Sequence, residues 1–391
     1  MIPLELTAAE QRAFHRALTR PHRDVRLRVD FLTLEHQVAS SATRAVVEAE
    51  MALERGDDRT VDRVLTLKLW DPQHRLGLSS ASPSQVQVTA DRMVRAIWSL
   101  WVPELDRFVD VPVFTGPVTK VEADDGLLSV EAQGKERLAV FARGRTRTVA
   151  KGLTVLGAFR VVMREWIGED ERHLTRVPRW THMRLAEPLV LGVKSEGWIY
   201  ARHLAKLAGG HVFYDGRGDV VVRKLPRRPA WRFSHMDVVA YPGATVDALQ
   251  IVNKVVVHGA KVQGKPPVVG QAHLPVTHPH SAHSLGRRVD GDMVPRYLEG
   301  DPVQDDSVRT ESAADALAQR ILDDANRIDA QVEFESLVIP HLEPGDLCSV
   351  PQSVGGSDLS FRLWTLRMGL LHDGVMTVGH TRRARLRRGR R

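Results

Sequence analysis

The sequence contains very little cysteine, which excludes two common ways of stabilising a protein. Cys348 is the single cysteine among 391 residues, so no intramolecular disulfide and no multi-cysteine metal site can form. Long apolar runs are also missing, because no stretch approaches the roughly 18–20 uncharged apolar residues of a membrane-spanning helix. The first residues carry charges where a secretion signal needs an apolar stretch, so we expect no export by that route.

Excess charge is missing from the body of the chain. Lys and Arg number 55 against 48 Asp and Glu, a net charge of +7. All of this excess comes from the last ten residues, which contain Arg382, Arg383, Arg385, Arg387, Arg388, Arg390 and Arg391. Positions 1–381 therefore hold 55 − 7 = 48 basic and 48 acidic residues. A folded nucleic-acid-binding domain would spread its basic residues over one face, so contact with DNA or an acidic partner is expected only of the tail.

The composition and the length of the chain are typical of a globular protein of several domains. Hydrophobic residues make up 43% and charged residues 26% of the chain. At roughly 100–200 residues per domain, this length predicts two to four domains.

The first 139 residues show the alternation of antiparallel strands. Thr7 and Glu10 form a capping-box pattern that predicts a helix at the start. Segment 45–53 fits either a strand or an alanine- and glutamate-rich helix, and Asp125–Gly126 predicts a tight turn. Clear strand patterns recur at 25–31, 65–69, 94–101, 107–120 and 127–133. We therefore predict an N-terminal helix and a first antiparallel β-barrel over 1–139.

From about residue 140 the spacing of apolar residues changes from that of strands to that of helices. An apolar stripe predicts a helix over 149–167 that ends at Gly168, and a second helix is expected to begin at Ser195. The sequence Asp215–Gly216–Arg217–Gly218 between two apolar runs predicts a hairpin. We assign 140–230 to a small α+β domain.

The last third returns to strand patterns. We assign 231–262 and 309–386 to a second antiparallel β-barrel, which includes a helix from Thr310 to about Asp329. Residues 263–308 are rich in proline, glycine and histidine, so we interpret them as a loop-rich surface insertion that docks partners. Deletion of 266–300 is then expected to leave a folded protein. Residues 387–391 form the end of the basic tail.

The sequence offers no convincing catalytic or metal site. The most metal-like feature is a group of histidines, but no cysteine or carboxylate lies among them and their spacing fits no zinc pattern: His273, His278, His280 and His283. We interpret them as part of a polar loop. Four acidic pairs are interpreted as solvated acids: Asp57–Asp58, Asp124–Asp125, Asp305–Asp306 and Asp323–Asp324. No phosphate-binding loop or nucleophile motif is present, so we predict a protein that is not an enzyme and has no cofactor or metal.

Nine segments, taken in order, carry a resemblance to a known family. They are Phe114–Val118, Asp124–Val130, Gly134–Lys135, Gly197–Gly209, Phe213–Gly218, Val222–Arg223, Ile251–Val257, Leu337–Pro340 and Leu342–Asp346. With them the chain resembles the hub, tail-associated or minor tail proteins at the tail tip of long-tailed bacteriophages, of the type found in actinobacterial phages. Each motif is a structural pattern, but together they span nearly the whole chain.

The resemblance implies a virion scaffold at the tail tip. Such hubs have two similar tube-like barrels and smaller α+β domains, and three copies form a ring that joins the sixfold tail tube to a threefold tip. It further implies contact with the distal tail or tail-tube proteins, other tip proteins and the tape-measure protein, and transient contact with DNA during ejection. Many relatives continue into a fibre or a wall-degrading domain; we expect this chain to depart from them by ending at the second barrel and the basic tail.

Two other functions remain open at this stage. The arginine tail alone predicts a nucleic-acid-binding protein, and a tip location is compatible with a cell-wall hydrolase. For the tail itself, three interpretations stay open: a solubilising end, a docking segment for partner proteins, or a DNA contact.

Overall fold

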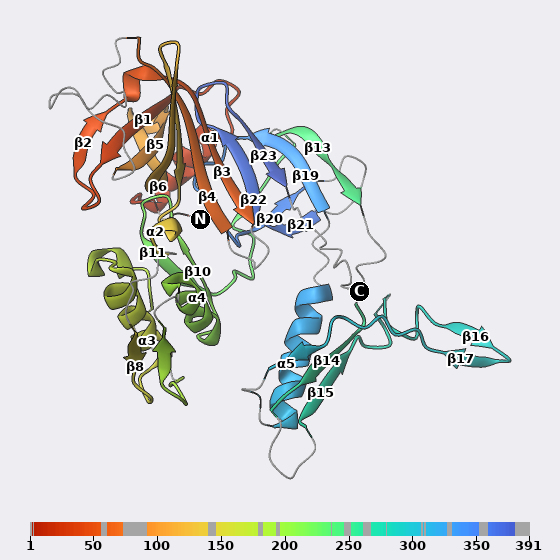
Figure 1. Ribbon diagram of the computed structural model, residues 1–391. Helices are drawn as coiled ribbons and strands as arrows, with labels where there is room; N and C mark the ends of the chain where they lie inside the picture. Colours follow the sequence, from red (N-terminus) through yellow and green to blue (C-terminus); the bar gives the residue numbers. More distant parts are fainter. Residues whose placement is uncertain are drawn as a thin grey trace. The chain divides into compact units, whose positions relative to one another are not determined.

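A computed structural model describes most of the chain as two compact units (Figure 1). The first unit comprises Met1–Ala244 and Gln331–Arg391, and the second comprises Thr245–Ala330, so the second interrupts the sequence of the first. The described residues are 2, 4–55, 61–72, 92–139, 146–178, 183–192, 196–235, 237–245, 252–260, 267–278, 280–305, 308, 310–326, 331–351 and 359–379. No helix among them is long and apolar enough to cross a membrane.

The first unit is built on one eleven-stranded sheet. Its strands lie in the spatial order β13-β19-β23-β22-β3-β4-β7-β6-β5-β1-β2. Their bounds are β1 Val25–Leu32, β2 Val38–Ser41, β3 Val46–Arg55, β4 Val61–Trp70, β5 Met93–Val102, β6 Arg107–Asp124, β7 Leu127–Gln133, β13 Val238–Thr245, β19 Gln331–Leu337, β22 Thr365–Gly369 and β23 Val375–Gly379.

This sheet corrects the expectation of two closed barrels. It starts in β13 and ends in β2, so the described strands form one open sheet and close no barrel. The reason lies at β3, which pairs with β4 on one side and with β22 on the other. An N-terminal barrel would need β3 to pair within residues 1–139, whereas here it joins the N-terminal strands to the C-terminal ones (Figure 1).

Local predictions in this region are confirmed. Of the two alternatives left open for 45–53, the strand is the one found: β3 begins at Val46 and is paired at both edges. Asp125 and Gly126 have φ values of 40° and 76°, the left-handed pair that a two-residue hairpin turn requires. Helix α1 (Ala8–Leu18) begins with the predicted capping box: Glu10 N donates to Thr7 Oγ1 at 3.3 Å, and Thr7 N donates to Glu10 Oε2 at 2.8 Å. The buried face of α1, with Phe14 and Leu18, contacts β5.

A smaller α+β part follows β7. Its elements are α2 Glu136–Ala139, β8 Arg147–Val149, α3 Val155–Val161, the π-helical turn η3 Val162–Ile167, the 3-10 turn η4 Glu171–Leu174, β9 Leu189–Leu191, α4 Gly197–Leu207, β10 His211–Tyr214 and β11 Val220–Arg223. The helix expected over 149–167 begins later, after the Thr154 cap, because 147–149 pairs with β9. It ends at Gly168, with φ 88°, as predicted. Ser195 lies outside the described residues, and Glu196 is the N-cap of α4. The β10–β11 hairpin is confirmed.

Three short strands complete the first unit, and two short 3-10 turns accompany the large sheet. β12 Trp231–Arg232, β20 Leu347–Val350 and β21 Leu359–Arg362 form a separate sheet in which β12 and β20 are parallel. The turns are η1 Thr43–Ala45 and η2 Pro103–Leu105.

The second unit is a small sheet covered by one helix. β14 Lys254–His258, β15 Val269–His273 and β18 Val303–Gln304 form the sheet, and α5 Glu311–Asn326 packs on one face of it. A Cβ on Gly270 would lie 2.4 Å from the backbone of Ala314, so only glycine permits this close packing. A further hairpin, β16 Arg287–Val289 with β17 Asp292–Val294, projects from the unit.

This unit differs from the expected domain division. β14 and α5 were assigned to the second barrel and 263–308 to a loop-rich insertion, but all of them belong to one unit. β15, inside the expected insertion, pairs with β14 along its whole length, and Ala272 lies in the shared core. Deletion of 266–300 would remove this core strand, so we now expect the deletion variant to lose the fold of this unit. The strand was missed because its two buried residues, Gly270 and Ala272, give a weak hydrophobic pattern.

Candidate functional site

The structure does not extend to the arginines that the sequence singled out. Arg382, Arg383, Arg385, Arg387, Arg388, Arg390 and Arg391 lie outside the described residues, as does the segment 387–391. Cys348 lies fully buried in β20. Burial, reinforced by Asp346, raises the pKa of its thiol far above the ordinary range, so the thiolate form that reactive cysteines need is disfavoured.

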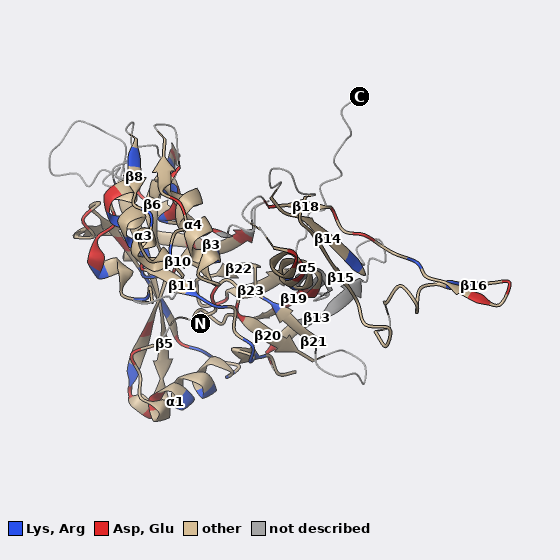
Figure 2. Cartoon of the chain, turned by 90° about the horizontal axis from the view of Figure 1, so that it is seen from below, with Lys and Arg blue, Asp and Glu red and all other residues tan. Residues whose placement is uncertain are grey.

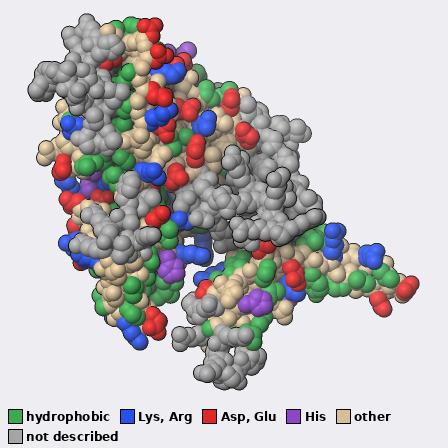
Figure 3. Space-filling model, in the orientation of Figure 1, with side chains coloured by type: hydrophobic (Ala, Val, Ile, Leu, Met, Phe, Trp, Pro, Cys, Tyr) green, Lys and Arg blue, Asp and Glu red, His purple; other side chains and the backbone are tan. Residues whose placement is uncertain are grey.

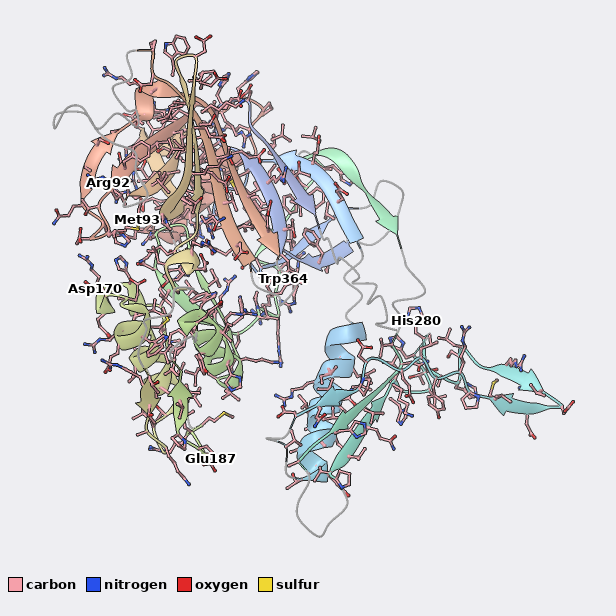
Figure 4. All side chains as sticks on the ribbon, viewed as in Figure 1. Arg92, Met93, Asp170, Glu187, His280 and Trp364 are labelled. Atoms are coloured by element: carbon pink, nitrogen blue, oxygen red, sulfur yellow. The ribbon has the colours of Figure 1, made fainter. Side chains whose placement is uncertain are left out.

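The histidines predicted to form a polar loop lie in the second unit. His273 is on β15, while His280 N donates to His278 Nδ1 at 3.1 Å and the two rings are 5.6 Å apart. Figure 4 shows His280 near the point where the β16–β17 hairpin leaves the unit. Over the part of the chain that the structure describes, no three His, Cys, Asp or Glu side chains gather as a metal ion would require.

The most elaborate constellation is a buried polar cluster in the first unit, which we call the polar joint. It lies where three loops meet strands β4 and β6: the loop after β7 (with the first residue of α2), the β10–β11 turn and the loop before β20. The residues just before and just after η4 add Glu169 and Arg176. The joint consists of Arg63, Lys135, Glu136, Glu169, Arg176, Tyr214, Asp215, Arg223, Glu343 and Asp346.

The β10–β11 turn enters this joint against β6. Asp215, fully buried, accepts hydrogen bonds from Arg217 N at 2.9 Å and Asp219 N at 3.0 Å, and it also pairs with Arg176. A Cβ on Gly216 would lie 2.1 Å from the carbonyl oxygen of Pro112, so only glycine allows the turn to reach the strand. The glycines of this turn, which the sequence assigned to the hairpin alone, therefore also make the contact between the α+β part and the sheet.

Lys135 from the loop after β7 and Glu169 from the segment before η4 hold that turn in place. Lys135 Nζ is 2.9 Å from Glu169 Oε1 and donates to Gly218 O at 3.1 Å, while Tyr214 Oη donates to Glu169 Oε2 at 2.8 Å. Burial lowers the pKa of Lys135, against the opposing effect of Glu169. Burial also raises the pKa of Glu136 to about 7, because its carboxyl is sealed away from water; the hydrogen bond that Glu136 Oε1 accepts from Tyr214 N at 3.1 Å acts in the opposite direction.

The third loop contributes a second pair of buried acids. Glu343 pairs with Arg63 of β4 at 3.2 Å, and Arg63 Nη1 also donates to Val113 O at 2.7 Å. Burial raises the pKa of Glu343, partly offset by Arg63. Asp346 accepts from Arg223 of β11 at 2.9 Å and from Glu343 N at 2.8 Å. The loop therefore contacts both the large sheet and the α+β part.

Chemically, the polar joint connects parts of the fold. Its acids are paired internally with cations or backbone donors, and the side chains of Arg63, Lys135 and Glu343 are at most 4% exposed. Such a network fixes the geometry between the elements that supply it. The sequence contained one clue to it: Arg63 continues the alternation of Leu65, Leu67 and Leu69, which places a charge on a core face.

The structure also exposes a second feature, the β16–β17 hairpin, which we call the projecting hairpin. Its turn, Asp290–Gly291, has φ values of 53° and 93°, and its strands pair from Arg287↔Val294 to Val289↔Asp292. In Figure 2 the ribbon at its tip has the colour of acidic residues, and the ribbon on its flank has the colour of basic ones. Sequence analysis placed a docking arm in this region but did not identify the hairpin.

Comparison with known proteins identifies the architecture. No family model and no curated protein matches the chain. Among solved structures, the 43 kDa tail protein of prophage MuSo2 from Shewanella oneidensis is 10% identical, with a TM-score of 0.56 over 91% of this chain and 98% of that one. A tail protein from Neisseria meningitidis MC58 is 13% identical, with a TM-score of 0.55 over 91% and 97%. This chain has the fold of a phage tail protein.

A third structure agrees with this assignment of the tail-protein fold. The prophage tail protein gp18 from Listeria monocytogenes EGD-e is 10% identical, with a TM-score of 0.52 over 91% of this chain and 95% of that one. Because the likeness covers nearly the full length of each chain, it is an agreement of architecture and not of one isolated domain.

Proposed function

We propose that this chain is a structural protein of the phage virion and forms the hub of the tail tip in a long-tailed phage. One observation carries the proposal: three tail proteins share its fold over 91% of its length and at least 95% of their own. Three copies would form a ring that joins the sixfold tail tube to a threefold tip and lines the path of the DNA.

The proposed symmetry requires two similar halves in one chain. In the large sheet, β1–β7 and the C-terminal strands β13, β19, β22 and β23 would each act as a tube-like half, so three copies would present six similar surfaces to the tube and three to the tip. The terminal strands β2 and β13 of the described sheet support association, because an exposed sheet edge is usually paired, covered or protected.

The polar joint suits such a scaffold. A hub must transmit force between tube and tip without changing shape, and buried ion pairs between the sheet and the α+β part would hold their mutual geometry. In this proposal the chain performs no catalysis. Receptor binding and cell-wall cleavage would then belong to other tip proteins, and the tube and tape-measure proteins would be neighbours. An actinobacterial host is the extension suggested by the sequence resemblance.

The proposal is tested by measuring the mass of the purified protein and the shape of the assembled particle. We expect size-exclusion chromatography with light scattering to give a trimer, or a monomer that becomes a trimer on purified tail tubes. Negative-stain electron microscopy should then show a threefold ring with a central channel. A stable dimer or tetramer under both conditions would contradict the hub assignment. A zymogram on cell wall, in which we expect no clearing, tests the non-enzymatic role.

A further inference from the structure

The solvent face of the large sheet carries an excess of acidic side chains around β23. Side chains two residues apart on a strand, and those directly opposite on the neighbouring strand, share one face. On β19, β22, β3 and β4 this rule places six acids and two cations on one face, which we call the acidic face: Glu48, Glu50, Glu54, Asp62, Glu333 and Glu335, with Lys68 and Arg367. The alternate residues, among them Met51 and Met368, are fully buried on the other face. Figure 3 shows acidic side chains over these strands with few basic ones among them.

The cations of the acidic face do not balance its acids. Both are already paired on the face itself: Lys68 with Glu48 at 2.7 Å, and Arg367 with Glu54 at 3.5 Å. In the described part of the chain, no basic side chain lies within ion-pair distance of Glu50, Glu333 or Glu335. All three of these side chains are exposed, so an external cation can reach them.

The arginine-rich segment leaves the sheet at this face. β23 lies between β19 and β22, and Thr377 is directly opposite Glu335. In an antiparallel pair the residue two positions later on one strand is opposite the residue two positions earlier on the other. Gly379, the last residue of β23, is therefore beside Glu333, and the seven arginines follow within the next twelve residues.

The segment is long enough to cover the acidic face. An extended chain advances at most about 3.3–3.6 Å per residue, so Arg382, three residues after Gly379, can lie about 10 Å away. Neighbouring strands are about 4.7–4.9 Å apart, and β3 with Glu50 is two strands from β23. A short tether also keeps the arginines at an effective concentration on the order of millimolar near these acids.

We propose that the arginine tail docks on the acidic face of its own chain, where its guanidinium groups pair with the carboxylates of Glu50, Glu333 and Glu335. Arginines held there cannot contact DNA at the same time. The acidic face thus competes with DNA for the tail and limits binding to nucleic acid until a stronger polyanion displaces the face. This inference goes beyond the hub proposal and does not depend on it.

Limited digestion with trypsin, which cleaves after arginine, tests the contact in the full chain. At about 20 mM salt, where charges are screened little, we expect the tail to be cleaved several-fold more slowly in the natural protein than in Glu333→Gln/Glu335→Gln. Mass spectrometry of the intact chain follows the loss of the tail. Exposed charges contribute little to the stability of a fold, so this variant should unfold at the natural temperature.

The matched control is Glu35→Gln/Glu187→Gln, which makes the same change of net charge away from the acidic face. Glu35 lies in the β1–β2 turn, and Figure 4 shows Glu187 on the α+β part. The control should keep the slow cleavage of the tail. Equal cleavage rates in the natural protein and in Glu333→Gln/Glu335→Gln would overturn the proposal. Protection that grows with protein concentration would overturn it too, because the tail would then dock on a neighbouring copy.

Fluorescence anisotropy with a labelled DNA duplex gives a second measurement. Glu333→Gln/Glu335→Gln should bind the duplex several-fold more tightly than the control variant, and truncation after Thr381 should abolish this gain. Equal affinities of the two variants would show that the acidic face does not compete for the tail, which contradicts the proposal. None of these results changes the mass of the assembled particle, so a failure here is distinguishable from a failure of the hub proposal.

Discussion

Arg63 on β4 and Glu343, 280 residues later, form an ion pair at 3.2 Å whose side chains are 3% and 0% exposed. Since Arg63 also donates to Val113 O on β6, this single guanidinium connects two strands of the large sheet to the loop before β20.

We predict that breaking this pair is costly. Arg63→Met leaves a buried carboxylate without its cation, so the free energy of unfolding, measured in urea, should fall by about 3–5 kcal/mol. The double variant Arg63→Met/Glu343→Leu should recover much of this loss and retain a deficit of about 1–3 kcal/mol, because Val113 O still lacks its donor.

The matched control is a pair on the surface. Lys68 and Glu48 are 2.7 Å apart with side chains 44% and 62% exposed, so Lys68→Ala should change the stability little. If Arg63→Met were as mild as Lys68→Ala, the buried pair would not contribute to the joint.

A second prediction concerns the approach of the β10–β11 turn to β6. Gly216→Ala would place a methyl group 2.1 Å from Pro112 O, a backbone atom that cannot move aside. We expect thermal unfolding to show a loss of at least about 1–3 kcal/mol. Gly379→Ala, where nothing lies within 4 Å of the added Cβ, should be neutral, and equal losses in the two variants would refute the interpretation.

A third prediction concerns pH. Burial raises the pKa of Glu136 to about 7 in the folded state from 4.5, so the unfolded chain releases this proton first as the pH rises. Glu136 therefore lowers the stability progressively between pH 4.5 and 7, by about 3 kcal/mol in total, and its effect is constant above that range.

The variant Glu136→Gln isolates this contribution. It should resemble the natural protein at pH 4.5 and be relatively more stable at pH 8, because the amide carries no charge to bury while its oxygen can still accept from Tyr214 N. Urea titrations of both proteins across this range give the difference directly. A difference independent of pH would show that the Glu136 carboxyl is ionised in the folded state.

A fourth prediction concerns the arginine tail. Truncation after Thr381 removes seven arginines and thus the whole net charge of +7. We expect the unfolding temperature to be unchanged. If the tail contacts DNA, binding measured by fluorescence anisotropy should fall steeply with salt and disappear on truncation. Undiminished DNA binding by the truncated chain would exclude the tail as the contact.

Sequence reasoning succeeded where structure is decided locally. The Thr7–Glu10 cap, the Asp125–Gly126 turn and the hairpin around Gly216 all follow from residues within a few positions of one another. The pairing of β3 with β22 and the ion pair of Arg63 with Glu343 do not, because nothing local specifies a partner about 300 residues away. Arg63 on a core face predicted that a buried counter-charge exists, but not which acid supplies it.

The position of the second unit has a consequence for how the chain can diverge. β13 and β19, which flank Thr245–Ala330 in sequence, are hydrogen-bonded neighbours in the large sheet. The second unit therefore stands where a loop would otherwise connect β13 to β19 as a hairpin. The entropic cost of closing such a connection grows only slowly with its length. Recombination can exchange, enlarge or shorten the second unit while the order of the strands in the large sheet stays the same. The hairpin that this unit carries could thereby change while the strands of the large sheet stay the same.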